Sequence, residues 1–395
     1  MVANMHPSHQ DIIDFIRALY PSKDSKTDAL IALHAPLFAG NEKKYLLDCI
    51  DSTFVSSVGA YVTQFEQSVT TTTGAKHAIA TVNGTAALHI ALLLAGVKAG
   101  EEVITQPLSF VATCNAIAYC NAKPVFVDVN RHTLGMNPAS LLDFLSNHCL
   151  INSQGCFNKA TGRRIAAVLP MHTFGLPCDL EQLIAICAEF NLPLIEDAAE
   201  SLGSYYHQQH TGTFGLLGTL SFNGNKTITT GGGGMILTND DELARRAKHL
   251  TTTAKLAHPY EFVHDDIGYN YRLPNINAAL GCAQIEMLPQ LLASKRKIAQ
   301  AYASFFADTR YTLVKEPDNT HANYWLNAVI CPTPSARDQF LTELIAANIM
   351  VRPIWTLVNT LPMYADCQAM DLANAQWLVE RVVNLPSSAR FDLPR

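Results

Sequence analysis

Short apolar segments alternate with longer amphipathic or Ala- and Leu-rich segments between residues 77 and 251. A short apolar run bounded by turn residues is typical of a buried strand, and apolar positions at helical spacing are typical of a helix. The predicted strands are residues 77–82, 102–106, 124–129, 165–169, 194–196, 219–222 and 235–238, and the predicted helices are residues 85–95, 110–119, 180–190 and 240–251. This alternation predicts an α/β domain, in which helices cover both faces of a mainly parallel sheet.

The pattern differs on either side of this region and at one place inside it. Residues 150–164 interrupt the alternation and are predicted to form an inserted turn or small hairpin. The outer elements are predicted helices at residues 10–20, 42–54, 284–306 and 335–347 and strands near 324–331. We therefore predict an N-terminal helical segment (residues 1–34), a large α/β domain (residues 35–284) and a smaller C-terminal α+β domain (residues 285–395).

Composition excludes several classes of partner. The chain has 395 residues and a net charge of −6, and no basic run suggests binding to nucleic acid or to a membrane surface. The apolar runs are too short for a spanning helix, and the N-terminus lacks the apolar core of a signal peptide. The ten cysteines form no CxxC pair. We therefore expect reduced thiols, a cytoplasmic location and no metal site.

Lys226 lies between an apolar segment and a run of four glycines that begins at Gly231. Glycines allow a close approach of backbone or cofactor, and a desolvated lysine is a good amine for a Schiff base. Upstream of it, the apolar strand at residues 194–196 is followed by Asp197. A Schiff-base lysine together with an aspartate for a pyridinium nitrogen is the pair that pyridoxal phosphate chemistry requires.

The turn between the strand at 77–82 and the helix at 85–95 is a candidate phosphate site. Gly84 allows close approach, and the first amides of the helix point outward without a partner. The alternative is an ordinary helix start capped by Asn83. The sequence contains no Gly-Lys-Ser/Thr at this turn and no Gly-x-Gly-x-x-Gly, so a Walker loop is excluded and a dinucleotide fingerprint is a poor match.

Two further side chains have a structural alternative. Phe110 opens a helix at the carboxyl end of a strand, where it would stack on a flat cofactor or else pack in the core. Asp197 would keep a pyridine nitrogen protonated, or else cap a helix. Glu196 points to the opposite face of the strand and is not interchangeable with Asp197.

Five motifs carry a resemblance to a known family. They are Asn83-Gly-Thr-Ala-Ala-Leu-His, Ser109-Phe-Val-Ala-Thr113, Glu196-Asp-Ala-Ala-Glu200, Ser221-Phe-Asn-Gly-Asn-Lys226 and Gly268-Tyr-Asn-Tyr-Arg272. From about residue 35 to its end, the chain resembles the DegT/DnrJ/EryC1/StrS sugar-nucleotide aminotransferases. That resemblance implies the aspartate aminotransferase fold (fold type I) and pyridoxal 5'-phosphate as cofactor. The insertion at 150–164 and the runs 229–234 and 251–255 are most similar to the enzymes of the legionaminic acid and bacillosamine pathways.

The resemblance also implies a role for individual residues. Lys226 would form the Schiff base with the cofactor and move the proton, and Asp197 would contact the pyridine nitrogen. Phe110 would stack on the ring. The remaining cofactor contacts implied are Gly84, Thr85 and Ser221 at the phosphate, and Asn270 or Arg272 reaching the phosphate from the neighbouring subunit of a homodimer. The sequence does not choose between Asn270 and Arg272.

Glu200 occupies a position where many relatives have Gln or His beside the phenolic oxygen of the cofactor. A second negative charge is unfavourable there, so we predict that Glu200 is protonated or turned away. The predicted substrate contacts are His172, Asn225, Lys255 and Arg352. The two cations are candidates for the nucleotide diphosphate, with a plain surface charge as the alternative. For His172 the alternative is a buried, hydrogen-bonded histidine.

These features predict an enzyme that transfers an amino group, from glutamate by analogy with the family, to the C4 ketone of a nucleotide-linked 4-keto-6-deoxy sugar. One alternative is another fold type I enzyme, such as a lyase or an amino-acid aminotransferase. The latter would need an arginine for the α-carboxylate, which we do not place in this sequence. A second alternative is a non-catalytic regulator or scaffold, which would tolerate loss of Lys226 or Asp197. The sequence leaves the nucleotide (UDP or GDP), the C2 substituent and the stereochemistry at the aminated carbon open.

Overall fold

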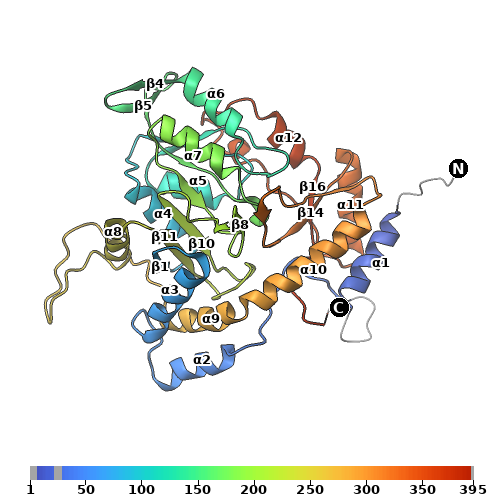
Figure 1. The fold of residues 1–395 in the computed structure, drawn as a ribbon, viewed down its shortest axis with the longest axis horizontal. Coiled ribbons are helices and arrows are strands. Elements are labelled where there is room, and N and C mark those ends of the chain that lie inside the picture. The colour runs from blue at the N-terminus through green and yellow to red at the C-terminus, as the bar shows by residue number, and fades with distance from the viewer. Residues whose placement is uncertain (1–6, 22–28, 393–395) are drawn as a thin grey trace.

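The computed structural model describes residues 7–21 and 29–392, and its centre is a twisted sheet (Figure 1). Across the sheet the strands run β1 (His77–Thr81), β11 (Gly234–Thr238), β10 (Leu217–Ser221), β7 (Ile195–Asp197), β6 (Arg164–Leu169), β2 (Glu102–Thr105) and β3 (Lys123–Phe126). β7 joins β6 through the parallel bridges Val168–Leu194 and Met171–Asp197. β11 runs antiparallel to β1 and β10, and the other neighbouring strands in this order are parallel, so the predicted mainly parallel α/β fold is confirmed.

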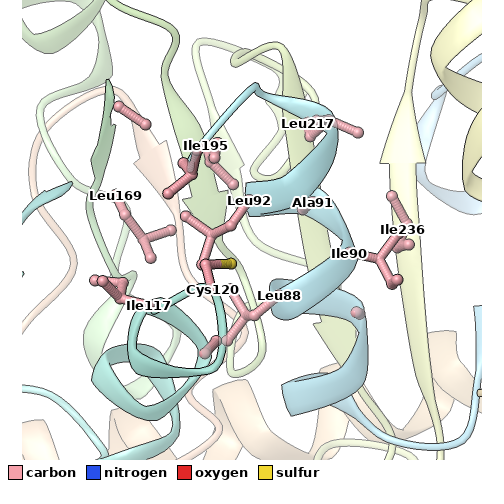
Figure 2. Packing of buried hydrophobic residues seen from close by; sticks show 14 of the residues in the cluster. Leu88, Ile90, Ala91, Leu92, Ile117, Cys120, Leu169, Ile195, Leu217 and Ile236 are labelled. Carbon is pink, nitrogen blue, oxygen red and sulfur yellow. The ribbon is translucent and has the colours of Figure 1, made fainter. Parts of the chain in front are cut away.

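Helices cover both faces of the sheet. On one face lie α4 (Gly84–Leu94), α5 (Ala112–Tyr119) and α8 (Asp241–Thr251), and Figure 2 shows Leu88, Leu92 and Ile117 from α4 and α5 packed toward Leu169 and Ile195 of the strands. On the other face, α3 (Ala60–Thr73) and α9 (Asn275–Glu286) cover β1, β11 and β10, while α6 (Pro138–His148) and α7 (Leu180–Glu189) cover β6, β2 and β3. Burial on both faces explains why these strands are almost continuously apolar.

The insertion at 150–164 forms a hairpin, as predicted. Its strands β4 (Cys149–Asn152) and β5 (Gly155–Asn158) pair antiparallel, and β5 also pairs antiparallel with β6. The hairpin therefore adds two antiparallel strands beside the first residues of β6. The Asn158 side-chain amide donates a hydrogen bond of 2.7 Å to the Glu102 carboxylate, which ties the insertion to β2.

The C-terminal lobe, by which we mean residues 312–392, has its own sheet. Its strand order is β12 (Thr312–Leu313), β14 (Asn327–Ile330), β16 (Val382–Leu385) and β15 (Arg352–Pro353), with helices α11 (Pro334–Ala346) and α12 (Ala373–Val379). The N-terminal helix α1 (His9–Leu19) lies beside α11 (Figure 1). Its Ile12, Ile13 and Ile16 belong to the same hydrophobic cluster as Phe340 and Leu344. The two ends of the chain thus share one hydrophobic cluster.

Several elements connect the two parts. The long helix predicted at 284–306 is wrong at its start: α9 ends at Glu286, and α10 (Leu288–Phe306) begins with a proline in its first turn. Proline favours the first turn of a helix and breaks the interior of one. The other elements are α2 (Glu42–Asp51), the 3-10 turns η1 (Thr173–Gly175) and η2 (Val358–Thr360), and a small sheet of β13 (Thr320–His321), β8 (Tyr205–Tyr206) and β9 (Gln209–His210). None of the helices in the described ranges combines the length and apolar character needed to cross a membrane.

Candidate active site

A pocket of about 300 Å³ opens at the carboxyl ends of β7 and β10, beside the first turn of α4. Open α/β sheets commonly bind ligands at this edge. Eight residues singled out in the sequence line it together: Gly84, Thr85, Phe110, Asp197, Glu200, Ser221, Asn225 and Lys226. They come from four separate stretches of sequence, and the fold brings them to one cavity.

Lys226 lies in the loop after β10, and its side chain is 14% exposed. Its Nζ is 3.1 Å from Oε1 of Glu200 and 4.0 Å from the centre of the Trp325 ring. The Trp325 indole N–H donates a 2.6 Å hydrogen bond to the backbone carbonyl of Asn225, which fixes the ring under the lysine. A carboxylate and an aromatic face therefore hold the amine between them.

Asp197 ends β7 and is buried on the floor of the pocket. Its Oδ2 accepts a hydrogen bond of 2.7 Å from the Thr113 hydroxyl, and its Oδ1 accepts one of 3.2 Å from the Ala199 amide. Burial raises the pKa of this carboxyl, whereas the Thr113 hydroxyl acts to lower it. A buried carboxylate of this kind suits a positively charged N–H donor in the ligand.

The first turn of α4 has the features of both predicted roles, a capped helix start and a phosphate site. Asn83 caps the helix, since its side chain accepts a hydrogen bond of 2.8 Å from the Ala86 amide. The amides of Gly84 and Thr85 have no acceptor among the described residues. A Cβ added at Gly84 would come within 2.9 Å of Cβ of Ser221, so the Ser221 hydroxyl faces the same space. Two free amides and a hydroxyl at a helix N-terminus fit a phosphate group.

Phe110 is 51% exposed and borders the pocket, so it is not a core residue. Its ring centre is 6.5 Å from that of Trp355, which in turn lies 5.1 Å from the ring of Phe174. The pocket thus has an aromatic wall next to the polar groups that would hold a ligand. This arrangement suits a flat ring with a charged edge.

Glu200 is 3% exposed and points at Lys226, so it is not turned away from the pocket. Its Oε2 accepts a 2.9 Å hydrogen bond from the Phe174 amide. Burial raises the pKa of Glu200 to about 7, although Lys226 and the Phe174 amide act to lower it.

The structure does not place five predicted residues in this pocket lining. They are His172, Lys255, Asn270, Arg272 and Arg352. His172 is fully buried, with Nε2 3.0 Å from Glu196 and Nδ1 accepting from the Cys178 amide, which leaves no ring nitrogen for a substrate. Since Nδ1 accepts from the Cys178 amide, Nε2 is the ring nitrogen that donates to Glu196.

The other four lie outside the pocket. Lys255 places its ammonium 3.9 Å from the centre of the Phe262 ring, and exposed Arg352 donates to the neighbouring Val351 carbonyl. Arg272 Nε donates a 3.0 Å hydrogen bond to Oδ1 of Asn270, so these two side chains form one unit. No ion pair joins Arg272 to a carboxylate within the described ranges.

Sequence reasoning missed three residues that shape the site. Thr113 binds Asp197, and Trp325 lies under Lys226. The Asn323 side-chain amide donates to the backbone carbonyls of Glu200 (2.8 Å) and Leu202 (2.9 Å). Thr113 lies four residues after Ser109 in one of the five motifs, which is a usable signal, whereas nothing near Asn323 or Trp325 in the sequence points to Lys226.

Comparison with known proteins gives consistent matches. The model of the DegT/DnrJ/EryC1/StrS aminotransferase family matches residues 37–393. The chain is 37% identical to a GDP-perosamine synthase of Escherichia coli O157:H7, over 90% of this chain and 93% of that protein. It is 34% identical to the putative pyridoxal phosphate-dependent aminotransferase EpsN of Bacillus subtilis, over 85% and 84%. The crystal structure of an aminotransferase from Psychrobacter cryohalolentis has a TM-score of 0.80 at 26% identity, over 89% of this chain and 93% of that one.

Proposed function

Because this chain belongs to the DegT/DnrJ/EryC1/StrS aminotransferase family, we propose that it transfers an amino group from glutamate to the C4 ketone of a nucleotide-linked 4-keto-6-deoxy sugar. The observation that carries this proposal is that Lys226 and Asp197 line one pocket, together with a helix N-terminus that suits a phosphate group. A non-catalytic scaffold would have no need to keep this set of groups together in one cavity. The enzyme is a pyridoxal phosphate-dependent transferase, in line with its relatives.

The residues of the pocket fit pyridoxal 5'-phosphate. Asp197 would hold the pyridine nitrogen, the amides of Gly84 and Thr85 with the Ser221 hydroxyl would hold the phosphate, and Phe110 would cover the ring. When bound, the cofactor supplies an electron sink that stabilises negative charge on the carbon losing a proton. The buried carboxylate of Asp197 favours the protonated ring that makes this sink effective.

The chain itself supplies the proton transfers. Lys226 Nζ takes the α-proton of the amino donor in the first half-reaction and delivers a proton to C4 of the sugar in the second. Low exposure of the lysine limits the access of solvent to that proton. Glu200 and Trp325 hold the amine at one place, which general acid–base catalysis requires.

We assign the product to amino-sugar biosynthesis for a surface glycan such as lipopolysaccharide or capsule, of the legionaminic acid or bacillosamine type. Similarity in the hairpin at 150–164 and in the runs 229–234 and 251–255 supports this finer assignment. Asn225, which lines the pocket, is the predicted substrate contact that the structure supports best. The nucleotide stays open between GDP, named in the perosamine synthase relatives, and UDP. Nine buried free cysteines support a reducing, cytoplasmic location.

We further propose that the active unit is a homodimer with the site at the subunit interface. Lys226 is the only Lys or Arg among the residues that line the pocket, so the phosphate lacks a cation from its own subunit. Arg272, braced by Asn270, is the candidate to supply it to the partner's site. Two exposed apolar areas support a second copy as the partner: Phe38, Leu47, Ile50, Phe54 and Val58 in and around α2, and Tyr260, Phe262 and Ile267 in the loop after α8.

Two experiments test these proposals. The protein is mixed with glutamate and a panel of GDP- and UDP-linked 4-keto sugars, and mass spectrometry follows conversion of the ketone to an amine. The Lys226→Ala variant is the control, and a panel without any conversion would refute the activity. To test the dimer, equal amounts of the Lys226→Ala and Arg272→Ala proteins are mixed and allowed to exchange subunits. About half of the dimers are then mixed, and each mixed dimer has one intact site of its two, so activity should return to about a quarter of wild type. No recovery would contradict a shared site.

A further inference from the structure

The nearest anionic partner of the catalytic lysine is Glu200. Its Oε1 is 3.1 Å from Nζ, and this is the only carboxylate in ion-pair contact with Lys226 in the described part of the chain. The Glu200 side chain is 1% exposed and that of Lys226 is 14% exposed. Water therefore has little access to the contact, so Glu200 is the acceptor nearest to hand for a proton that leaves the ammonium.

The backbone around Glu200 holds its carboxylate in place. Phe174, whose amide binds Oε2, has a φ of 57°, a left-handed conformation that costs a non-glycine residue on the order of 1–3 kcal/mol. Gly175 follows with a φ of 87°, and a Cβ there would lie 1.9 Å from Oδ1 of Asn323. Asn323 in turn donates to the Glu200 carbonyl. A strained turn that fixes one carboxylate is a feature typical of functional sites.

The charges around Glu200 suit exchange of a proton. Lys226 faces it from the loop after β10 and acts to lower its pKa, whereas Asp197, at the end of β7, acts to raise it. Burial is the largest influence and brings the pKa to about 7. His34 and Lys295 lie behind Trp325, where the Lys295 ammonium contacts the His34 ring at 2.7 Å and the Trp325 carbonyl at 3.2 Å. Neither of them contacts the Glu200 carboxylate.

We propose that Glu200 is the proton acceptor of Lys226, and that the pair shares one proton. In this step the O–H bond of Glu200 forms as one N–H bond of the Lys226 ammonium breaks, giving a neutral amine and a neutral acid. The reverse transfer restores the ion pair. The inference rests on the proposed function, because a lysine must be a neutral amine before it can take a proton from the amino donor.

The test measures the reactivity of Lys226 in cofactor-free protein. Trace acetic anhydride acylates the protein over a range of pH, and mass spectrometry reads the peptide that contains Lys226. A pair that shares a proton titrates in two steps. We expect wild-type reactivity to rise first near pH 7 and again at higher pH. Glu200→Gln should lose the first step, whereas the control Trp325→Phe, which changes the other contact of Nζ, should keep it.

A single rise in the wild-type profile, or an unchanged profile in Glu200→Gln, would overturn the proposal. The wild-type profile decides the first point without any variant. The second point can also be read in the holoenzyme, where Glu200→Gln should shift the pH dependence of the visible absorbance of the lysine–cofactor Schiff base. If these profiles fail while amine transfer to the sugar persists, the proton-sharing inference is wrong and the proposed function still stands.

Discussion

The hydrogen bond from Thr113 to Asp197 offers a sharp test of how the pocket holds its cofactor. Both side chains are buried, and the Thr113 hydroxyl lies 2.7 Å from Oδ2 of Asp197. Thr113→Val keeps the shape of the side chain and removes the donor. Oδ2 then has no hydrogen-bond donor from the described residues, and Oδ1 keeps only the Ala199 amide.

The size of the effect follows from the charge on the acceptor. A hydrogen bond to a charged group contributes about 1.5–3 kcal/mol, and about 1.4 kcal/mol corresponds to one unit of pKa. The substitution should therefore raise the pKa of Asp197 further, in the direction in which burial already moves it. Because Asp197 is proposed to bind the pyridinium as an ionised carboxylate, loss of that hydrogen-bond energy (about 1.5–3 kcal/mol) from the complex should raise the dissociation constant of pyridoxal 5'-phosphate about 10- to 100-fold.

The assay titrates cofactor-free protein with pyridoxal 5'-phosphate and follows the visible absorbance. Ser109→Ala is the matched control, since Ser109 contacts the Thr113 hydroxyl at 2.7 Å but makes no contact with Asp197. It should change the dissociation constant much less than Thr113→Val does. A folded Thr113→Val protein with wild-type affinity would refute the reasoning that Asp197 is tuned by this hydroxyl.

Three further predictions concern charge and space. Gly84→Ala should weaken cofactor binding, measured by the same titration, because its Cβ would come within 2.9 Å of Ser221; unchanged affinity would argue against a phosphate seat there. Burial raises the pKa of Glu200 from 4.5 to about 7, so between these pH values the folded state keeps a proton that the unfolded state has lost. The free energy of unfolding should therefore fall by about 3 kcal/mol as the pH rises through that interval. Urea unfolding of cofactor-free Glu200→Gln should lack this fall, and an identical pH profile would contradict it. Burial lowers the pKa of Lys295 from 10.5 to about 7, so the free energy of unfolding should rise by about 5 kcal/mol as the pH increases from about 7 to 10.5. A Lys295→Met protein that still shows this rise would exclude Lys295 as its source.

The strands of the large sheet could be predicted because burial on both faces leaves a simple apolar signal. The direction of β11 could not, since the same apolar run fits a parallel or an antiparallel neighbour. The helices α3 and α6 were also missed. α3 contains a run of four threonines, Thr70–Thr73, which have low helix propensity, and its packing against α9 compensates for this.

The sequence predicted several residues that line the pocket, but it did not predict the residues that hold them in place. Lys226, Asp197 and Gly84 stand in local patterns whose spacing reflects a strand end or a helix start. His172 has a comparable position after a strand, yet its ring serves the buried carboxylate of Glu196. Local sequence places a side chain at one edge of a sheet, but it does not decide whether tertiary packing leaves that side chain open to the pocket.

The support of Lys226 comes from two distant parts of the chain, and this has a mechanistic consequence. Glu200 belongs to the large sheet region, whereas Trp325 and Asn323 belong to the C-terminal lobe. Any displacement of that lobe would move the indole away from the amine. It would also break the hydrogen bond that Asn323 donates to the Glu200 carbonyl. The position of the reactive amine and the docking of the lobe are therefore coupled, so substitutions at this contact should alter proton transfer even where they touch neither cofactor nor substrate.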